Sequence, residues 1–582
     1  MKHVLILSYF LLIGSLQLVF SQHNEISKDE NTIAQIPQES VFIHYNNSLL
    51  FSGENLYYSV YCLEESSNIL SNISKVIYVE LINENKASVF KHKLFINEGR
   101  GYGKYFIPSS IKSGNYKLIA YSQWMLNEPD NIIDKNDIKI INPFKNSDIL
   151  IDDKLDSISL VQTPKTKNID KVKTGLNIKL KSNKYSNREK VEFEIIVNEG
   201  YELPSNFSVS VKLLESLNKP EKQTSSSFVN LNKAQNNNHA EIKYLPEVRG
   251  EIISGKAYDK NTKSIVEDVA ISLSIPGEED VFKVSKTNNK GEFFFTNHLS
   301  YDGHKAYLQV VCENEETIEI ELNRKGVYNS KNLNFEKLNL SKTEKDFILK
   351  HSFYNQISNA YAEGKPGFKN EKKLFSPFYG VDGTTYILDD YKRFPTIKEV
   401  VIEIIDLVSV SKENGDVRFQ VDKFNGDYIF DSEPLILVDG VVICDQNKLA
   451  ELDANLVKSL TVIRGLRVYG LKLFNGILSI ETFGGNYATK EGRSFKESIK
   501  ITPPLNDLND FEHSYEGENK NKYKRVPDFR TQLYWNPIVK ESKPNEIFSF
   551  WTSDVKGDFE ISVEGFTNSG KPVSLKKVFT VE

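Results

Sequence analysis

The sequence predicts a mainly β, multidomain chain in which β-sandwiches follow one another in series and one small α/β domain accompanies them. Three observations predict this fold class. The 582 residues suffice for several separate cores. Short apolar stretches with two-residue alternation recur between turn residues over most of the chain. A helical period appears only between about 341 and 460, where strand patterns and helix patterns alternate.

Composition excludes several classes of protein. Charged residues make up 26% and hydrophobic residues 39% of the chain, which excludes a wholly disordered chain and a polytopic membrane protein. The formal charge is −6 and no basic stripe is found, so no nucleic-acid partner is expected. Cys62, Cys312 and Cys444 each lie in an apolar run. We expect core cysteines in strands rather than reactive thiols or a disulfide framework.

The first 21 residues read as a secretory signal peptide. Lys2 and His3 precede the apolar stretch Val4–Phe20, and Ser21 ends the cleavage site, so the mature chain would begin at Gln22. An N-terminal membrane anchor is the alternative interpretation. Residues 22–38 are polar and predict a flexible lead. No later window is long and apolar enough to span a membrane, because charged residues interrupt even the best candidate, 400–410.

Three β-sandwiches are predicted before the helical period begins. The first covers 39–145, where strand patterns alternate with turns such as Ser113–Asn115. The second covers 146–245 and contains a long polar loop at 216–240, rich in Ser, Lys, Asn and Gln. The third covers 246–325 and alternates again.

A helical and irregular connector is predicted over 326–395. Ser341 and Glu344 form a capping-box pattern, and four apolar residues then share one helix face. These are Phe347, Tyr354, Ile357 and Tyr361. The small α/β domain follows at 396–485.

The α/β domain opens with a short helix capped by Thr396. Leu435–Val438 is predicted as a buried strand, 449–460 as a helix, and 460–463 and 477–482 as further strands. A C-terminal β-sandwich is predicted over 486–582.

Several of these segments resemble domains of exported multidomain envelope proteins of Bacteroidota. Residues Gly114–Asn127 resemble a macroglobulin-like domain, and Lys184–Val191 a second one. Residues 253–259 and 287–293 resemble a carboxypeptidase-regulatory-like sandwich, although its usual Gly-x-Pro-Leu segment is missing. The strongest resemblance, to the plug domain of TonB-dependent receptors, rests on Pro434–Val441, Asn455–Val462, Tyr469–Gly470 and Asn475–Thr482. Pro527–Pro537 is also typical of these proteins.

The resemblance implies a plug-like domain without its barrel. A receptor barrel of about 22 strands needs roughly 220 residues before loops are counted. Only 97 residues follow Gly485, and the residues before 396 are predicted as sandwiches and connector. The expectation is an adaptor that meets a barrel made by another chain, or a small α/β domain reused for a different contact.

The sequence predicts no catalytic residue, cofactor site or metal site. No cysteine has a thioester context, the histidines form no zinc pair, and no Gly-x-Ser-x-Gly elbow occurs. Gly99–Lys104 lacks the context of a phosphate loop and is interpreted as a glycine-rich turn between strands. Asp382 and Asp389–Asp390 are interpreted as solvated turns rather than calcium ligands. Asp439–Gly440 is expected to shape a turn.

Tyr534 and Trp535 are the candidate partner contacts. Two large aromatic residues beside Asn536–Pro537 could anchor a partner if exposed. Burial in a sandwich is the other interpretation, in which the two rings belong to the core and do not anchor a partner.

The sequence therefore predicts a non-enzymatic scaffold or accessory subunit of the cell envelope. It would reach the periplasm or the outer-membrane surface of a Gram-negative bacterium. There it would bind an outer-membrane β-barrel protein complex through its sandwich arm and plug-like domain, and associate with the membrane peripherally through that partner. The alternative is capture of a peptide or glycan substrate for a separate TonB-dependent transporter.

Overall fold

The computed structural model divides the chain into two compact units. We call residues 37–250, 325–373 and 504–582 the sandwich-pair unit, and residues 251–324 and 374–503 the insert unit. The structure describes residues 36–129, 132, 135–145, 150–151, 175–214, 219–232, 242–311, 317–336, 339–340, 342–361, 377–423, 432–487, 497–505, 513–540 and 546–582. The predicted signal peptide, nearly all of the predicted lead, Ser341 and Cys312 lie outside these residues.

The first sandwich of the sandwich-pair unit is built from two sheets, as predicted. One sheet contains β1 (Glu39–Tyr45), β3 (Asn55–Glu64) and β6 (Arg100–Phe106). The other contains β2 (Leu49–Phe51), β8 (Lys135–Ile141), β7 (Gly114–Tyr121), β4 (Val76–Ile82) and β5 (Ser88–Phe95). Alternate residues of facing strands, among them Val41, Val60 and Leu118, fill the core between the sheets.

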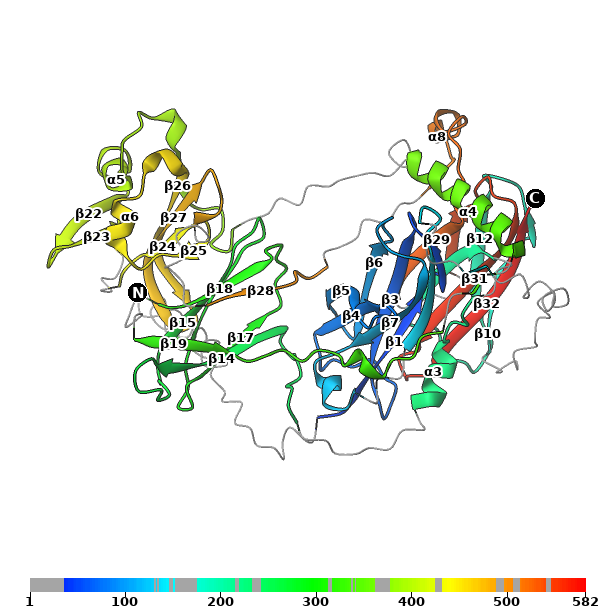
Figure 1. Ribbon diagram of the computed structural model, residues 1–582. Helices are drawn as coiled ribbons and strands as arrows, with labels where there is room; N and C mark the ends of the chain where they lie inside the picture. The colour runs from blue at the N-terminus through cyan, green and yellow to red at the C-terminus, as the bar shows by residue number, and fades with distance from the viewer. Residues whose placement is uncertain are drawn as a thin grey trace, which may run out of the picture. The chain divides into compact units, whose positions relative to one another are not determined.

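The second sandwich takes its strands from two distant parts of the sequence. One sheet contains β10 (Leu176–Leu180), β12 (Lys190–Val197) and β30 (Ile547–Trp551). The other contains β11 (Lys184–Tyr185), β32 (Pro572–Val581), β31 (Gly557–Phe566), β13 (Asn206–Leu213) and β29 (Gln532–Lys540). Figure 1 shows the teal early strands interleaved with the red late strands. Phe193, Val209 and Phe559 belong to their shared core.

This arrangement corrects the domain boundaries drawn from sequence. Ranges 146–245 and 486–582 were expected to form two separate sandwiches, but their strands pair with one another: β13 lies between β29 and β31. The first half supplies two strands to each sheet, and the second half supplies one strand to the three-stranded sheet and three to the five-stranded sheet. Neither half can therefore complete both sheets and bury its apolar face alone. The insert unit therefore interrupts the second sandwich.

The two sandwiches pack against each other across β1 and β13. Every residue of β1 is buried, although successive side chains point to opposite faces. Val41, Ile43 and Tyr45 enter the core of the first sandwich, whereas Phe42 packs with Phe566 of the second. The same alternation in β13 points Ser208, which is fully buried, away from its own core and toward the first sandwich, where it bonds with His44.

A helix occupies part of the range predicted as a mobile loop. Helix α3 (Ser225–Asn232) lies within 216–240. Thr224 and Ser227 exchange hydrogen bonds at its start, and Phe228 is fully buried with Phe42. Two adjacent apolar residues, Phe228 and Val229, supply the contact that a purely compositional interpretation overlooks.

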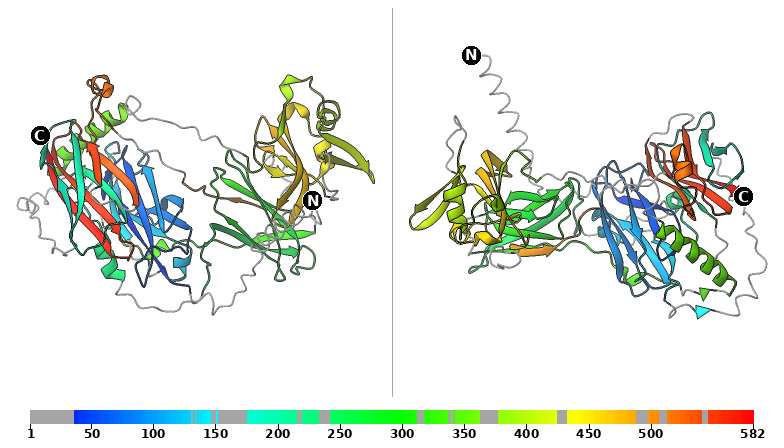
Figure 2. Two further views of the ribbon diagram at one scale, coloured as in Figure 1. Left: turned by 180° about the vertical axis from the view of Figure 1, so that it is seen from behind. Right: turned by 90° about the horizontal axis from the view of Figure 1, so that it is seen from above.

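Helix α4 (Lys342–Ala360) confirms the predicted helix in the connector. Phe347 packs beside the cluster of Leu49, Phe51 and Ile348, and His351 stacks on Phe51 at 4.2 Å between ring centroids. One of the further views shows α4 as an unbroken helix (Figure 2). Of the predicted apolar face, Phe347 alone lies at this cluster, which contains Phe51 of β2. Tyr354 instead stacks on Phe529 beside the core of the second sandwich, and Tyr361 is 45% exposed.

The insert unit begins with the third sandwich, as predicted. One sheet contains β17 (Glu292–Asn297), β14 (Glu251–Asp259) and β19 (Ile318–Leu322). The other contains β16 (Val281–Lys286), β15 (Ala270–Ile275), β18 (Lys305–Val310) and β28 (Glu497–Lys500). Strand β28 comes from the range assigned to the C-terminal sandwich and pairs with β18 instead.

The α/β domain of the insert unit, here residues 377–487, contains a five-stranded sheet. Its order is β21 (Thr384–Ile387), β26 (Val457–Tyr469), β27 (Lys472–Thr482), β24 (Leu435–Val438) and β25 (Val441–Val442). A separate hairpin joins β22 (Val408–Glu413) to β23 (Asp416–Val421). Helix α5 (Ile397–Ile404) starts where predicted, since Thr396 accepts a hydrogen bond from the Glu399 amide.

The sheet of the α/β domain is covered on both faces. Helix α5 and helix α6 (Gln446–Ala450) pack on one face, against Leu460 and Ile480. The other face, with Leu437 and Phe474, packs against Phe282 of β16 in the third sandwich. The helix predicted over 449–460 is largely wrong: α6 ends at Ala450, only a short 3-10 turn follows at Ala454–Leu456, and β26 already begins at Val457.

Candidate functional site

The predicted partner contacts Tyr534 and Trp535 lie on β29 and are half-buried. Consecutive strand residues point to opposite faces, so the two rings do not form one patch. The Tyr534 ring stacks with Phe550 of the second sandwich, at 6.0 Å between centroids. The Trp535 ring lies 5.2 Å from His44 and 6.0 Å from Tyr57 of the first sandwich. A partner contact of either residue stays a prediction.

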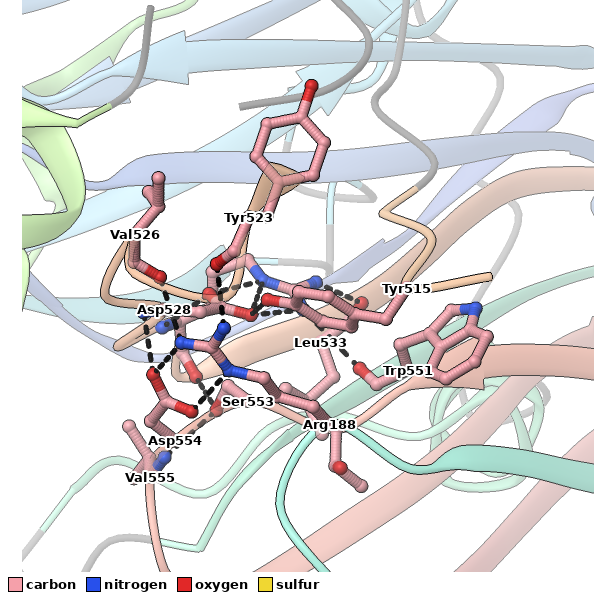
Figure 3. Close-up of polar contacts among 12 residues, drawn as sticks. Arg188, Tyr515, Tyr523, Val526, Asp528, Leu533, Trp551, Ser553, Asp554 and Val555 are labelled. Atoms are coloured by element: carbon pink, nitrogen blue, oxygen red, sulfur yellow. Dashed lines mark hydrogen bonds and ion pairs between the residues drawn. The ribbon is translucent and has the colours of Figure 1, made fainter. Parts of the chain in front are cut away.

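The motif that precedes these aromatics holds a buried ion pair (Figure 3). Arg530 Nε donates to Asp528 Oδ1 at 2.8 Å and Nη2 donates to Oδ2 at 2.7 Å. The Tyr515 hydroxyl donates to the same Oδ2 at 2.7 Å. Asp528 is only 2% exposed, and burial by itself opposes its ionisation. The positive charge of Arg530 nevertheless holds the pKa of Asp528 well below its usual range. Burial and the neighbouring carboxylate raise the pKa of Tyr515.

A second ion pair continues this network to the first half of the split sandwich. Arg188 donates to both carboxylate oxygens of Asp554, at 2.7 and 2.6 Å. Its guanidinium also donates to the carbonyl oxygens of Tyr523 and Val526, at 2.9 and 2.8 Å. The Asp528 amide donates to Asp554, which links the two pairs (Figure 3). The chemistry of the network is structural: it ties three separate chain segments together.

Asp439 shapes the turn between β24 and β25, as expected. Asp439 and Gly440 both adopt positive φ, at 49° and 77°. The Asp439 carboxylate accepts hydrogen bonds from the amide and hydroxyl of Thr482, at 2.8 and 2.7 Å, and from the Tyr487 amide at 2.9 Å. These partners belong to the same α/β domain, so Asp439 anchors the end of β27.

An exposed apolar surface lies at the end of the β26–β27 ladder where β26 begins. Phe483 is 58% exposed and Leu456 is 52% exposed, and the Phe483 amide donates to the Leu456 carbonyl oxygen at 3.0 Å. The Arg393 guanidinium lies 5.6 Å from the centre of the Phe483 ring. It is fixed there by donating to the carbonyl oxygens of Ala454 and Val457, at 2.8 and 2.7 Å. We call Arg393, Leu456 and Phe483 the ladder-end surface.

A second exposed apolar surface lies at the hairpin end of the same ladder. Val468 and Leu473 are directly opposite each other and are 51% and 37% exposed; Leu466, two residues before Val468, is 40% exposed. Gly470 forms the turn at φ 58°, and a side chain there would meet the Val284 carbonyl oxygen. The other face of the hairpin, with Tyr469 and Phe474, packs on Phe282. This end is therefore held rigidly while its apolar outer face stays uncovered.

Sequence reasoning missed both surfaces. Residues 454–480 contain no acidic residue, and Leu466 and Val468 continue the alternation of β26 beyond its buried part. The signal available in the sequence was an apolar alternation that continues beyond the part of β26 that has a second neighbouring strand. Strand β21 pairs only with residues 459–462 of β26.

The described residues contain no group of three or more His, Cys, Asp or Glu side chains arranged to hold a metal ion. Within the same residues, no helix is both long enough and apolar enough to cross a membrane. Cys62 is a buried free cysteine, as expected. Cys444 is disulfide-bonded, which corrects the prediction of a core thiol there; it lies partly buried beside Val311 and Val442.

Comparison with known proteins does not assign the chain to a family. No protein-family model matches it, and no curated protein matches it. Solved structures that are similar include bacterial α-2-macroglobulins, and the chain spans about two fifths of their length.

Two of these structures give the scale of the likeness. The Salmonella α-2-macroglobulin reacted with methylamine is 10% identical, with 93% of this chain and 39% of that chain covered and a TM-score of 0.23. The Escherichia coli α-2-macroglobulin activated by porcine elastase is 9% identical, with 94% and 44% covered and a TM-score of 0.24. The multidomain β-sandwich class rests on the sheets described above and not on this likeness.

Proposed function

We propose that the protein is a non-enzymatic scaffold or accessory subunit of a bacterial cell envelope that binds an outer-membrane β-barrel protein complex. In this proposal the third sandwich is carboxypeptidase-regulatory-like and the α/β domain is plug-like, as in Bacteroidota envelope proteins. The ladder-end surface is the docking site. The paired sandwiches form the rigid arm that carries further contacts.

The exposure of Phe483 and Leu456 is the observation that carries the proposal. Most of both faces of the sheet is covered within the insert unit, so its uncovered ends and edges remain for contacts with a partner. The ladder end presents an aromatic ring and an arginine, residue types that dominate binding energy in protein interfaces. Backbone bonds hold Arg393 in place, so little side-chain entropy is lost when a partner binds.

Export supports the cellular setting of the proposal. The first 21 residues have the pattern of a signal peptide. The disulfide at Cys444 is consistent with an oxidising compartment, where such bonds persist. Peripheral association with the outer membrane would then follow from the partner.

The test is co-purification from the native outer membrane in mild detergent with a tagged, full-length chain. We expect one barrel protein to co-purify in fixed proportion. Phe483→Ser should reduce its recovery at least about tenfold, because a central aromatic anchor is lost. Ile547→Ser is the matched control, since Ile547 is equally exposed, at 58%, but lies in the sandwich-pair unit.

Equal recovery of the barrel protein with both variants would remove the ladder end from the proposal. Recovery of a lone monomer with no barrel protein would overturn the subunit role. Recovery of a bound peptide or glycan instead would favour substrate capture for a separate transporter.

A further inference from the structure

A small cavity with polar side chains in its lining lies in the sandwich-pair unit where the first sandwich meets the second. Its lining comes from β1, from the segment before α3, and from β31 and β32. The residues that matter below are His44, Lys222, Gln223, Ser562, Glu564 and Lys576. The cavity has a volume of about 10 Å³, which is room for roughly one water-sized species.

Three polar atoms at this cavity have no hydrogen-bond partner in the structure. They are His44 Nε2, Gln223 Nε2 and Ser562 Oγ, and all three are buried. His44 is only 3% exposed and its Nδ1 lies 2.6 Å from Ser208 Oγ. Buried polar atoms are nearly always paired, so three together indicate a missing partner.

The hydrogen-bond pattern makes His44 Nε2 a donor. Tyr61 donates its hydroxyl proton to Ser208 Oγ at 2.9 Å. The Ser208 hydroxyl has two acceptors in reach, and His44 Nδ1 at 2.6 Å is much nearer than the Glu564 carbonyl oxygen at 3.4 Å. Burial lowers the pKa of His44, and nearby lysines lower it further, so the ring is neutral and carries its proton on Nε2. The Gln223 amide nitrogen and the Ser562 hydroxyl are donors as well.

The carboxylate beside the cavity already accepts hydrogen bonds on both of its oxygens. Glu564 Oε2 accepts from the amide and the hydroxyl of Ser225, both at 2.9 Å. Its Oε1 accepts from the Ser574 hydroxyl at 2.8 Å. The carboxylate therefore does not pair with the donors that line the cavity.

The charge around the cavity is positive. The positive charges of Lys212, Lys222 and Lys576 lower the pKa of His44. The negative charges of Glu560 and Glu564 raise the pKa of Lys222. Lys222 donates to the carbonyl oxygens of Tyr45 and Asn46, at 3.0 and 3.3 Å, rather than to a carboxylate. Burial lowers the pKa of Lys222 to about 8. A buried cation without a direct counter-ion favours an anion nearby.

We propose that this cavity binds one monatomic anion, chloride under ordinary conditions. The anion would accept hydrogen bonds from His44 Nε2, Gln223 Nε2 and Ser562 Oγ, while Lys222 and Lys576 balance its charge. Sulfate and carboxylate ions are too large for the space. Because the donors belong to both sandwiches, the bound anion stabilises their junction.

The test uses the full chain and sodium bromide or sodium chloride as the probe. Thermal unfolding is followed by tryptophan fluorescence at constant ionic strength, with gluconate as the balancing ion. We expect the unfolding temperature to rise and saturate with halide, as for a ligand that binds only the folded state. Crystals grown in bromide should show an anomalous peak within hydrogen-bond distance of His44 Nε2.

Matched variants separate binding from a general salt effect. Lys576→Met and Ser562→Ala should each raise the halide concentration at half-saturation about tenfold, the effect of losing one charge-assisted contact. Lys577→Met, the adjacent residue on the opposite face of β32, should leave it unchanged. Because Lys576 is exposed, Lys576→Met should not prevent folding.

Unfolding temperatures that are the same in chloride and gluconate, together with no bromide peak, would overturn the proposal and assign the cavity to a water molecule. A stabilisation that sulfate reproduces at equal ionic strength would also overturn it, because the cavity is too small for sulfate.

Discussion

The two units bury different chemistry. The sandwich-pair unit encloses charge: the Asp528–Arg530 pair and the His44 cluster lie between segments distant in sequence. In the insert unit, the α/β domain packs on the third sandwich through Phe282, Phe474 and Leu437. Exchange of similar apolar residues at an apolar contact changes stability little, whereas removing the partner of a buried charge lowers stability strongly. Loss of one charged partner in the Asp528–Arg530 pair should therefore cost more than exchange of a similar apolar residue at the Phe282 contact.

All three tryptophans lie in the sandwich-pair unit, at 124, 535 and 551. Tryptophan fluorescence therefore follows that unit alone, and amide hydrogen exchange can follow the insert unit. This separation lets each prediction test one side of the comparison.

The largest effect is expected from Arg530→Met. It leaves the Asp528 carboxylate buried without its cation, which should lower the free energy of unfolding by about 3–5 kcal/mol. Urea unfolding monitored by tryptophan fluorescence measures it. Lys184→Met, which breaks an ion pair between exposed side chains of the same unit, should cause no measurable change. Equal effects of the two variants would contradict the role assigned to buried charge.

Acid should destabilise the sandwich-pair unit. The Tyr58 hydroxyl and His92 Nδ1 share a hydrogen bond at 2.6 Å, and burial lowers the pKa of His92 from 6.5 to about 4. Between these values the unfolded chain binds a proton that the folded chain does not, so stability falls as the pH falls through 6.5 toward 4. The expected loss is about 3 kcal/mol for His92 alone, and His44 acts in the same direction.

His92→Gln should flatten this pH dependence in fluorescence-monitored unfolding. The exposed His298 of the insert unit is the control, and His298→Gln should leave the profile of the sandwich-pair unit unchanged. An unaltered profile in His92→Gln would show that other groups dominate acid unfolding.

The insert unit should respond to acid with the opposite sign. Burial raises the pKa of Asp280 to about 6, although the Phe378 amide donates to it at 2.8 Å. Its contribution is therefore favourable below the unfolded value of 3.8 and is lost as the pH rises through 6. Asp280→Asn keeps the acceptor and removes the buried charge, so above pH 6 it should stabilise the unit by about 2 kcal/mol.

Hydrogen exchange of the β16 amides, residues 281–286, measures the Asp280 effect. Asp268→Asn is the control, since its side chain is exposed and pairs with Lys286 at the surface of the same unit. Slower exchange in both variants alike would mean that removing any negative charge suffices.

Sequence reasoning reached the elements that local patterns encode. Helix α4, the Thr396 cap and strand β24 depend on periodicity and neighbouring residues, and the structure has them where predicted; β27 also ends where predicted but begins five residues earlier, at Lys472. The pairing of β13 with β29 was missed because no local pattern specifies which distant strand completes a sheet. The same limit applies to the candidate sites: the stretch Pro527–Pro537 was noted only for its resemblance, and neither the Asp528–Arg530 pair nor its link to Arg188, which depends on the split sandwich, was predicted.

The interruption of the second sandwich imposes an order on biosynthesis. Strands β10 to β13 are made first and then await β29, which follows after 318 residues, from 214 to 531. At roughly 5–20 residues per second, the ribosome needs about 15–60 seconds to supply them. During that interval β13 has unpaired edges and an uncovered apolar side. A nascent chain of this design would need a holding chaperone, and release of any product that stops short of β29 would leave a strand ready to aggregate.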